Sequence, residues 1–86
     1  MAVYSIFFKD SVWKDLDLIP KNDLQRIIER IGSLAEIPRP IGCEKLSGQE
    51  KYRLRQGNYR IVYSIQDTQL TVWVVKVGHR REANRD

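Results

Sequence analysis

The chain has 86 residues, of which 42% are hydrophobic and 30% charged, with one cysteine and a formal net charge of +4. A chain of this length builds one small core, so we expect a single domain over residues 1–86 without a cofactor. Cys43 alone forms no internal disulfide, and no Cys/His cluster has the spacing of a metal site. The first residues lack a signal-peptide pattern and no apolar run has membrane-spanning length, so we expect a cytoplasmic protein without a membrane role.

Positive charge is concentrated in the second part of the chain. Residues 1–50 hold seven basic and eight acidic side chains, whereas residues 51–86 hold eight basic and three acidic ones. The two parts therefore carry formal charges of −1 and +5. This asymmetry, with an isoelectric point near 9.5, indicates a polyanion partner such as RNA or DNA. Solubility is the alternative explanation, because net charge alone says nothing about fold or substrate.

The first residues predict a strand followed by a short helix. Residues 2–8 are rich in aromatic and β-branched side chains, and their even-numbered members share one apolar face by period two. Polar residues end this strand, and Asp10 or Ser11 is expected to cap a short helix. That helix is expected to run as far as Ile19 and Pro20, because the residue before a proline disfavours helical geometry.

The clearest helical pattern follows Pro20, which suits the first turn of a helix. Apolar side chains recur with a 3.6-residue period from Leu24 to Ala35, and Pro38 and Pro40 prevent much continuation. With the preceding segment, this pattern predicts a helical hairpin. The periodic residues are Leu24, Ile27, Ile28, Ile31, Leu34 and Ala35.

Loop and strand signals follow in the second half. Glycine, serine and charged residues over 41–50 predict a loop, and three later runs predict strands, which must be antiparallel neighbours because short turns join them. The order is β-α-α-β-β-β, an α+β domain with an amino-terminal helical hairpin packed on a small antiparallel-rich sheet. Both tryptophans, Trp13 and Trp73, are expected in the core, and the alternative is a surface groove for a partner protein. The predicted strands cover residues 51–55, 59–65 and 70–77, with turns at 56–58 and 66–69.

Basic side chains share one face of the central predicted hairpin. Residues two apart point to the same side of a strand, so Lys51, Arg53 and Arg55 lie together. Arg60 of the next strand points to the same side, because its alternate neighbours form the apolar face. Like charges repel, and no carboxylate is expected among them. Each residue alone fits a solvated surface, but the four together favour an anion site.

The end of the chain adds candidates for this site. The last predicted strand is followed by Gly78, His79, Arg80 and Arg81. His79 is able to transfer protons near neutral pH, although a single histidine at a strand end is more often a surface residue. Arg80 and Arg81 belong either to the anion site or to a solvated tail. Arg80 can belong to the anion site only if the fold brings it beside Arg60.

These residue types suit one metal-free reaction. The sequence contains no phosphate-binding glycine loop, no metal-ligand cluster and no serine–histidine–aspartate set. RNA carries its own nucleophile, the 2′-hydroxyl, and arginines stabilise the negative charge that develops when this group attacks the phosphate. Proton transfer must come from a histidine, tyrosine, lysine or carboxylate nearby. A cationic site is therefore able to cleave RNA without a metal.

Two segments resemble the RelE/ParE superfamily of bacterial and archaeal type II toxins. They are the run KYRLRQGNYRIVY at residues 51–63 and the run VGHRRE at residues 77–82. The amino-terminal strand, the helical hairpin and the loop at residues 46–48 also match. The resemblance therefore covers essentially the whole chain.

The resemblance implies the RelE-like branch, whose members cleave mRNA in the ribosomal A site, rather than the ParE-like branch, whose members poison DNA gyrase. It implies that Arg60 and Arg80 stabilise the phosphate, that His79 lies beside the scissile bond, and that cleavage leaves a 2′,3′-cyclic phosphate and a 5′-hydroxyl. The basic residues of the strand at 51–55 would hold RNA and contribute to proton transfer. The implied catalytic residues are Lys51, Arg53, Arg60, His79, Arg80 and Asn84, and the implied RNA-binding residues are Arg55, Arg81 and Arg85.

The resemblance also implies partners. A cognate antitoxin would neutralise the toxin, the ribosome and mRNA would be its targets, and operator DNA would bind only the toxin–antitoxin complex. The free toxin is expected to be a monomer. Two alternatives stay open: a ParE-like gyrase inhibitor with no nuclease activity, and a non-toxic relative that binds only its antitoxin and DNA.

One position departs from the family pattern. Many RelE-like proteins carry a tyrosine shortly after the HRRE segment, and the matching residue here is Asn84. An amide neither ionises nor stacks on a base as a phenol does. We therefore expect a weakened toxin, either diverged naturally or substituted deliberately.

Overall fold

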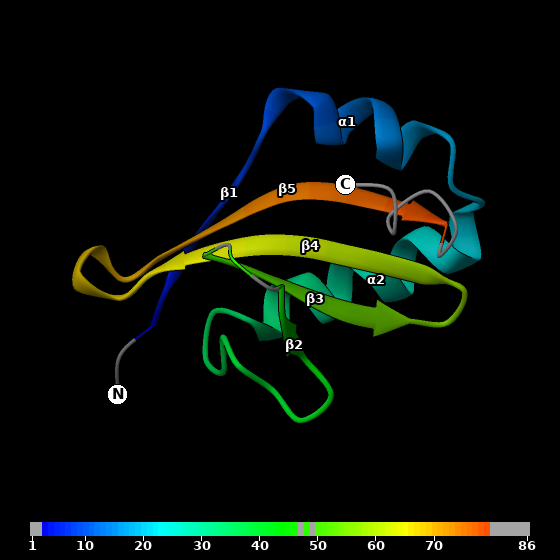
Figure 1. Cartoon of the computed structure of the whole chain (residues 1–86). Helices are drawn as coiled ribbons and strands as arrows, with labels where there is room; N and C mark the ends of the chain where they lie inside the picture. Colours follow the sequence, from blue (N-terminus) through cyan, green and yellow to red (C-terminus); the bar gives the residue numbers. More distant parts are fainter. Residues whose placement is uncertain (1–2, 47, 49, 80–86) are drawn as a thin grey trace.

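The computed structural model describes residues 3–46, 48 and 50–79. It contains two helices and a five-stranded sheet with the strand order β1-β5-β4-β3-β2 (Figure 1), which confirms the predicted α+β class. The predicted order of elements is also confirmed, with one additional short strand. The elements are β1 (Ser5–Phe8), α1 (Asp10–Asp17), α2 (Lys21–Ser33), β2 (Glu44–Lys45), β3 (Lys51–Gln56), β4 (Tyr59–Gln66), the 3₁₀ turn η1 (Asp67–Gln69) and β5 (Thr71–His79).

The sheet is antiparallel except at one edge. β3, β4 and β5 pair in antiparallel fashion, as the short turns between them require. β1 pairs with β5 in parallel, which is possible because the helical hairpin and the other strands separate the two in sequence. Gly57 adopts a φ of +59° in the turn between β3 and β4, a conformation that glycine reaches without a steric penalty.

The prediction of a loop throughout residues 41–50 is wrong. Glu44 and Lys45 form β2, which pairs with Arg53 and Tyr52 of β3. A two-residue strand is too short to produce an alternating pattern, and its conformation is imposed by the strand beside it. Because β2 pairs with only the first half of β3, no described strand covers the edge of β3 beyond Arg53.

The core lies between the two helices and one face of the sheet. α1 lies along β5, and α2 passes behind β3 and β4 (Figure 1). The predicted apolar face of β4 is confirmed, since Ile61, Tyr63 and Ile65 are all buried in this core. The core residues are Val12, Leu16, Ile19, Ile27, Ile31 and Leu34 of the helical segment and Leu54, Ile61, Tyr63, Ile65, Val72, Val74 and Val77 of the sheet.

The helix ends differ from the predictions by a few residues. α1 begins at Asp10 itself and has no side-chain cap, so neither Asp10 nor Ser11 caps it. Pro20 precedes α2 with an extended ψ of 146° instead of occupying its first turn. α2 ends at Ser33, before Ala35, because the chain tightens there into turns with hydrogen bonds to the third residue back.

Both tryptophans lie at the surface, so the prediction that they belong to the core is wrong. Trp13 is 53% exposed and Trp73 is 39% exposed. Smaller apolar side chains fill the buried face of α1, and Trp13 packs on Phe8 with ring centroids 5.0 Å apart. In β5, Trp73 lies between two buried valines, so strand alternation turns it to the other face of the sheet, where it stacks on Phe7 at 5.1 Å.

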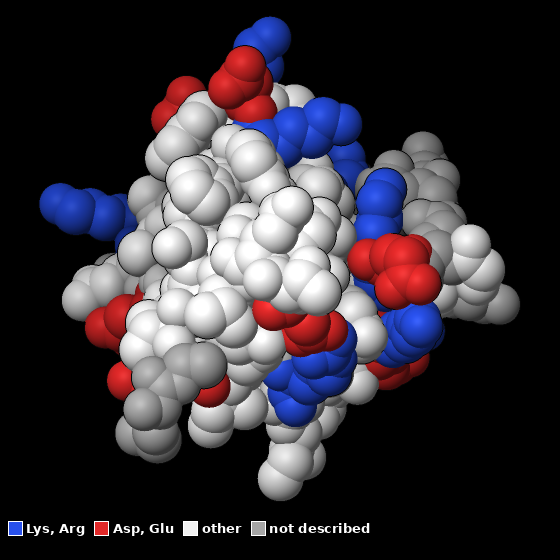
Figure 2. Space-filling model, turned by 90° about the vertical axis from the view of Figure 1, so that its left-hand side faces the viewer, with Lys and Arg blue, Asp and Glu red and all other residues white. Residues whose placement is uncertain are grey.

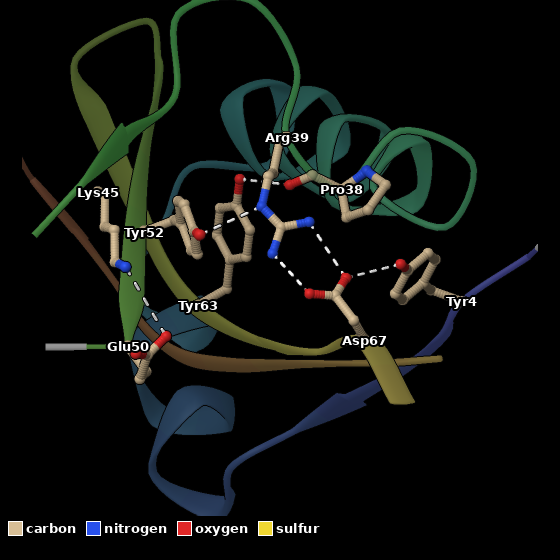
Figure 3. A network of polar contacts seen from close by, with 8 residues as sticks. All are labelled: Tyr4, Pro38, Arg39, Lys45, Glu50, Tyr52, Tyr63 and Asp67. Atoms are coloured by element: carbon tan, nitrogen blue, oxygen red, sulfur yellow. Dashed lines mark hydrogen bonds and ion pairs between the residues drawn. The ribbon is translucent and has the colours of Figure 1, made fainter. Parts of the chain in front are cut away.

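A polar network joins four segments at one end of the sheet (Figure 3). Arg39 donates two hydrogen bonds to Asp67, from Nη1 to Oδ1 at 3.1 Å and from Nη2 to Oδ2 at 2.8 Å. Its Nε donates to the hydroxyl of Tyr52 at 3.1 Å, and the hydroxyl of Tyr4 donates to Asp67 Oδ1 at 2.8 Å. The network therefore connects the segment before β1, the α2–β2 connection, β3 and the η1 turn.

These contacts shift the acid–base properties of the side chains. Hydrogen bonds from Arg39, and then from Tyr4, lower the pKa of the Asp67 carboxyl. The hydrogen bond to that carboxylate in turn raises the pKa of the Tyr4 hydroxyl. Burial is the main cause of the raised pKa of Tyr63, whose hydroxyl donates to the carbonyl of Pro38 at 2.8 Å. Tyr63 therefore stays protonated while it closes the core beneath the network.

Asp67→Asn is expected to lower the thermal unfolding midpoint at neutral pH, because Arg39 loses its charged bidentate partner. The folded-state pKa of Asp67 is depressed, so its contribution is complete above the unfolded-state value of about 3.9 and disappears as the pH falls through the folded-state value. Circular dichroism melts of wild type and Asp67→Asn are therefore expected to converge in acid. Asp17→Asn, an exposed change in α1, is the control. A difference that persists in strong acid contradicts this account.

Candidate functional site

The strand register brings the predicted basic residues onto one sheet face. Arg55 of β3 lies directly opposite Arg60 of β4, and Leu54 opposite Ile61. Because Leu54 and Ile61 are both buried on the helix side, the arginines on either side of them point to the opposite face. The prediction that Arg60 shares a face with the basic residues of the preceding strand is therefore confirmed. The predicted basic residues on this face are Lys51, Arg53, Arg55 and Arg60.

The prediction that no carboxylate lies among these cations is wrong. Glu44 of β2 lies opposite Arg53, and its Oε2 is 3.4 Å from Nη2 of Arg53. The sequence does not indicate this pair, because the composition of residues 41–50 predicts a loop and not a strand at the edge of the sheet. The Glu44 side chain is 68% exposed, so the pair contributes about 1 kcal/mol at most.

An open pocket of about 320 Å³ lies beside the uncovered edge of β3. The pocket is open because β2 pairs with β3 only as far as Arg53. The helix α2 contacts β3 on the helix-covered face of the sheet. Four of the described lining residues are arginines and one is a carboxylate, a formal excess of three positive charges. Such an arrangement attracts anions, and guanidinium groups suit phosphate in particular. The described lining residues are Arg30, Gly42, Glu44, Arg53, Leu54, Arg55 and Arg60.

Arg30 is not indicated as a site residue by the sequence. It lies in α2, between the buried helix positions Ile27 and Ile31. In the sequence it is an ordinary charged residue at the border of an apolar helical stripe, and no motif distinguishes it from Arg26 one turn earlier. Only the packing of α2 against β3 places Arg30 at the pocket.

The opposite end of the molecule has a different surface. The side that lies at the left of Figure 1 shows mainly uncharged side chains at its centre, with acidic and basic side chains interspersed around them (Figure 2). The described residues of this end include the Arg39–Asp67 pair, in which the two charges neutralise each other. A surface of mixed sign does not attract a polyanion as the arginine-lined pocket does.

His79 lies away from the basic face. It is opposite Tyr59 in the register, with ring centroids 5.8 Å apart, whereas Gly78 is opposite Arg60. Paired strand residues point to the same side, so His79 and Tyr59 lie on the helix-covered side of the sheet. There His79 lines a separate pocket of about 160 Å³ with residues of α1, including Asp15. The structure therefore does not bring His79 beside Arg60.

Four predicted site residues lie outside the described residues, namely Arg80, Arg81, Asn84 and Arg85. Within residues 3–46, 48 and 50–79, no group of three or more His, Cys, Asp or Glu side chains is placed to hold a metal ion. In the same residues, no helix is long and apolar enough to cross a membrane.

A small α+β domain with an arginine-lined pocket at an open sheet edge has the features of a polyanion-binding protein. The family model for the ParE toxin of the type II toxin-antitoxin system parDE matches residues 6–84. The chain therefore belongs to this toxin family within the RelE/ParE superfamily, and its relatives identify it as a RelE-like toxin.

Three relatives illustrate the similarity. The chain is 30% identical over 86 residues to Toxin RelG of Mycobacterium tuberculosis. The matched region covers 95% of this chain and 97% of that protein. The RelBE2 toxin–antitoxin complex of the same organism contains a similar chain, with a TM-score of 0.81, 28% identity, and coverage of 91% of this chain and 99% of that one. The archaeal RelE–RelB complex of Pyrococcus horikoshii also gives a TM-score of 0.81, with 29% identity and coverage of 93% and 97%.

Proposed function

We propose that this RelE-like toxin is an endoribonuclease that cleaves mRNA in the ribosomal A site and requires no metal ion. The single observation that carries the proposal is the pairing of Arg55 directly opposite Arg60, beside Arg53, at an open pocket. Like charges at directly opposite positions destabilise a sheet. An anionic ligand would offset this repulsion, and the RNA phosphate is the anion that the relatives' family suggests.

The proposed reaction uses the RNA as its own nucleophile. The 2′-oxygen forms a bond to the adjacent phosphorus, and the bond from phosphorus to the 5′-oxygen breaks, which leaves a 2′,3′-cyclic phosphate and a 5′-hydroxyl. Arg60 and Arg80 stabilise the charge that develops on the phosphate oxygens. Arg53 and Arg55 hold the RNA chain.

Lys51 is the proposed proton-transfer group of the basic face. One proton leaves the 2′-hydroxyl and one must reach the departing 5′-oxygen. Lysine is able to exchange a proton, whereas arginine remains protonated at all relevant pH values. His79 is a weaker candidate, because its register position is on the other side of the sheet from Arg60.

We also propose a cognate antitoxin as partner, since similar chains were solved as toxin–antitoxin complexes from Mycobacterium tuberculosis and Pyrococcus horikoshii. The antitoxin would neutralise the basic face, and operator DNA would bind the complex but not the free monomeric toxin. Action on ribosomes would place the protein in the cytoplasm.

Primer extension on translated messages after induction of the toxin tests the proposal. Cuts in phase with codons are expected in the wild type. The rival function is inhibition of DNA gyrase, which is favoured by the ParE name of the matching family model. Induction of the DNA-damage response without mRNA cuts would support gyrase inhibition and overturn the nuclease proposal. Growth without any arrest would favour a non-toxic relative.

Asn84→Tyr is expected to increase toxicity, because a phenol at this position restores the base-stacking or proton-transfer group that many RelE-like proteins carry. The measurement is growth arrest after graded induction of the two variants from the same promoter. Asn84→Phe separates the two roles, because phenylalanine stacks but does not transfer a proton. Equal growth arrest in wild type and Asn84→Tyr contradicts the proposal that the asparagine weakens the toxin.

A further inference from the structure

The guanidinium of Arg30 contains a buried donor with no acceptor. Its Nε is shielded from solvent and makes no hydrogen bond, and it is the one such side-chain atom among the described residues. A buried N–H group without an acceptor is rare in folded proteins, because it loses its hydration and gains nothing in return. A donor of this kind at the wall of a pocket indicates an acceptor that arrives with a ligand.

Arg30 lies where two pockets meet. On one side is the pocket of about 320 Å³ that it lines with Arg53, Arg55 and Arg60. On the other side is an open pocket of about 270 Å³, which Arg30 lines with Gln56 and further residues of α2. Arg30 therefore stands beside the uncovered end of β3, where a chain leaving the basic face would turn towards α2.

No described carboxylate satisfies Arg30. Glu29 lines the neighbouring pocket, and Glu44 lines the larger one, where it pairs with Arg53. Neither of them lies within ion-pairing distance of Arg30. The ligand that completes the site must therefore supply negative charge from outside the described residues.

We propose that Arg30 binds a phosphate of single-stranded RNA next to the scissile one, so that the RNA chain passes from the Arg55–Arg60 pair around the edge of β3 to α2. This inference rests on the proposed function. A guanidinium presents donors in a fixed planar fork that matches two phosphate oxygens, so it positions the RNA chain as well as attracting it. Arg30 extends the site beyond the residues that contact the reacting phosphate.

Arg30→Met tests the inference, because methionine keeps an unbranched side chain at this position and removes both the charge and the buried donor. The probe is a fluorescein-labelled single-stranded RNA with every 2′-hydroxyl methylated, which the toxin cannot cleave. Fluorescence anisotropy is expected to show about tenfold weaker binding. The negative slope of log affinity against log salt concentration is expected to become less steep by about 0.7. The thermal unfolding midpoint is expected to stay the same or rise, because the unpaired donor is gone.

Lys21→Met is the matched control. Lys21 lies on the same helix, is exposed, and lines neither of the two pockets at Arg30. The substitution Lys21→Met removes the same charge as Arg30→Met. It is expected to change RNA affinity less than twofold, because Lys21 attracts RNA only through diffuse electrostatics. Arg30→Gln is the second variant, which keeps a polar side chain for folding and is expected to bind RNA as weakly as Arg30→Met.

Equal losses of affinity in the Arg30 and Lys21 variants overturn the inference. Lower stability of both Arg30 variants with unchanged RNA affinity also overturns it, because the side chain then has a purely structural role. The proposed nuclease function is tested separately with Arg60→Ala in the cleavage assay. If Arg30→Met weakens RNA binding while Arg60→Ala still cleaves mRNA, Arg30 is a binding residue and the nuclease mechanism is wrong.

Discussion

Arg60→Ala is expected to reduce cleavage of ribosome-bound mRNA by about 10²–10³-fold, the usual effect of removing one donor that stabilises transition-state charge. Arg60 is on β4, directly opposite Arg55 of β3, and it forms part of the wall of the arginine-lined pocket. It belongs to a strand whose alternate side chains are buried, so the fold fixes the face of the sheet on which Arg60 lies before the substrate arrives. The single-turnover rate on programmed ribosomes measures this effect.

Lys14→Ala is the control for that variant, because it removes one positive charge from the exposed surface of α1. We expect its cleavage rate to stay close to that of the wild type. The far-ultraviolet circular dichroism of Arg60→Ala is expected to be unchanged, because Arg60 is not part of the core. Unchanged cutting by Arg60→Ala rules out the proposed role of Arg60 in the reaction.

Leu54→Ala is expected to destabilise the fold by about 2–5 kcal/mol, because it opens a cavity between β3 and the helices. Leu54 is only 1% exposed, and it separates Arg53 from Arg55 along the strand that carries the basic face. A domain of this length has a free energy of unfolding of about 4–13 kcal/mol, so the variant loses a large part of its stability. Urea unfolding followed by circular dichroism measures the loss.

Leu18→Ala is the matched control, because it makes the same chemical change at a side chain that is 83% exposed. Its effect is expected to stay within about 0.5 kcal/mol. Leu54→Met, which nearly conserves volume, is expected to cost less than about 1.5 kcal/mol. Similar unfolding midpoints for Leu54→Ala and Leu18→Ala contradict the placement of Leu54 in the core.

Most of the fold could be predicted because its signals are local. The helical period from Leu24 onward and the alternation of β3 and β4 each arise within a few residues, and the short turns leave no arrangement other than antiparallel pairing. The sequence-based predictions fail where contact with a neighbouring element decides the conformation or the burial of a residue. β2 is a strand because β3 pairs with it, and Trp73 is exposed because one face of β5 has no helix over it.

The candidate site divides in the same way. Alternation along a strand is a property of the chain, so the sequence by itself determined that Lys51, Arg53, Arg55 and Arg60 share one face. Only the tertiary structure decided that Glu44 joins them and that His79 lies on the other side. Strand register depends on pairing partners that are distant in sequence, and a single residue at a strand end carries no periodic signal.

Arg30 shows why the remainder of the site needed the three-dimensional fold. The sequence determined that it belongs to a helix and borders an apolar stripe, which describes most charged residues of amphipathic helices. The packing of α2 against β3, and the short length of β2, decided that this arginine meets a pocket with a buried, unpaired Nε. A local pattern specifies how a segment folds, but burial and contact between segments arise only when the whole chain packs.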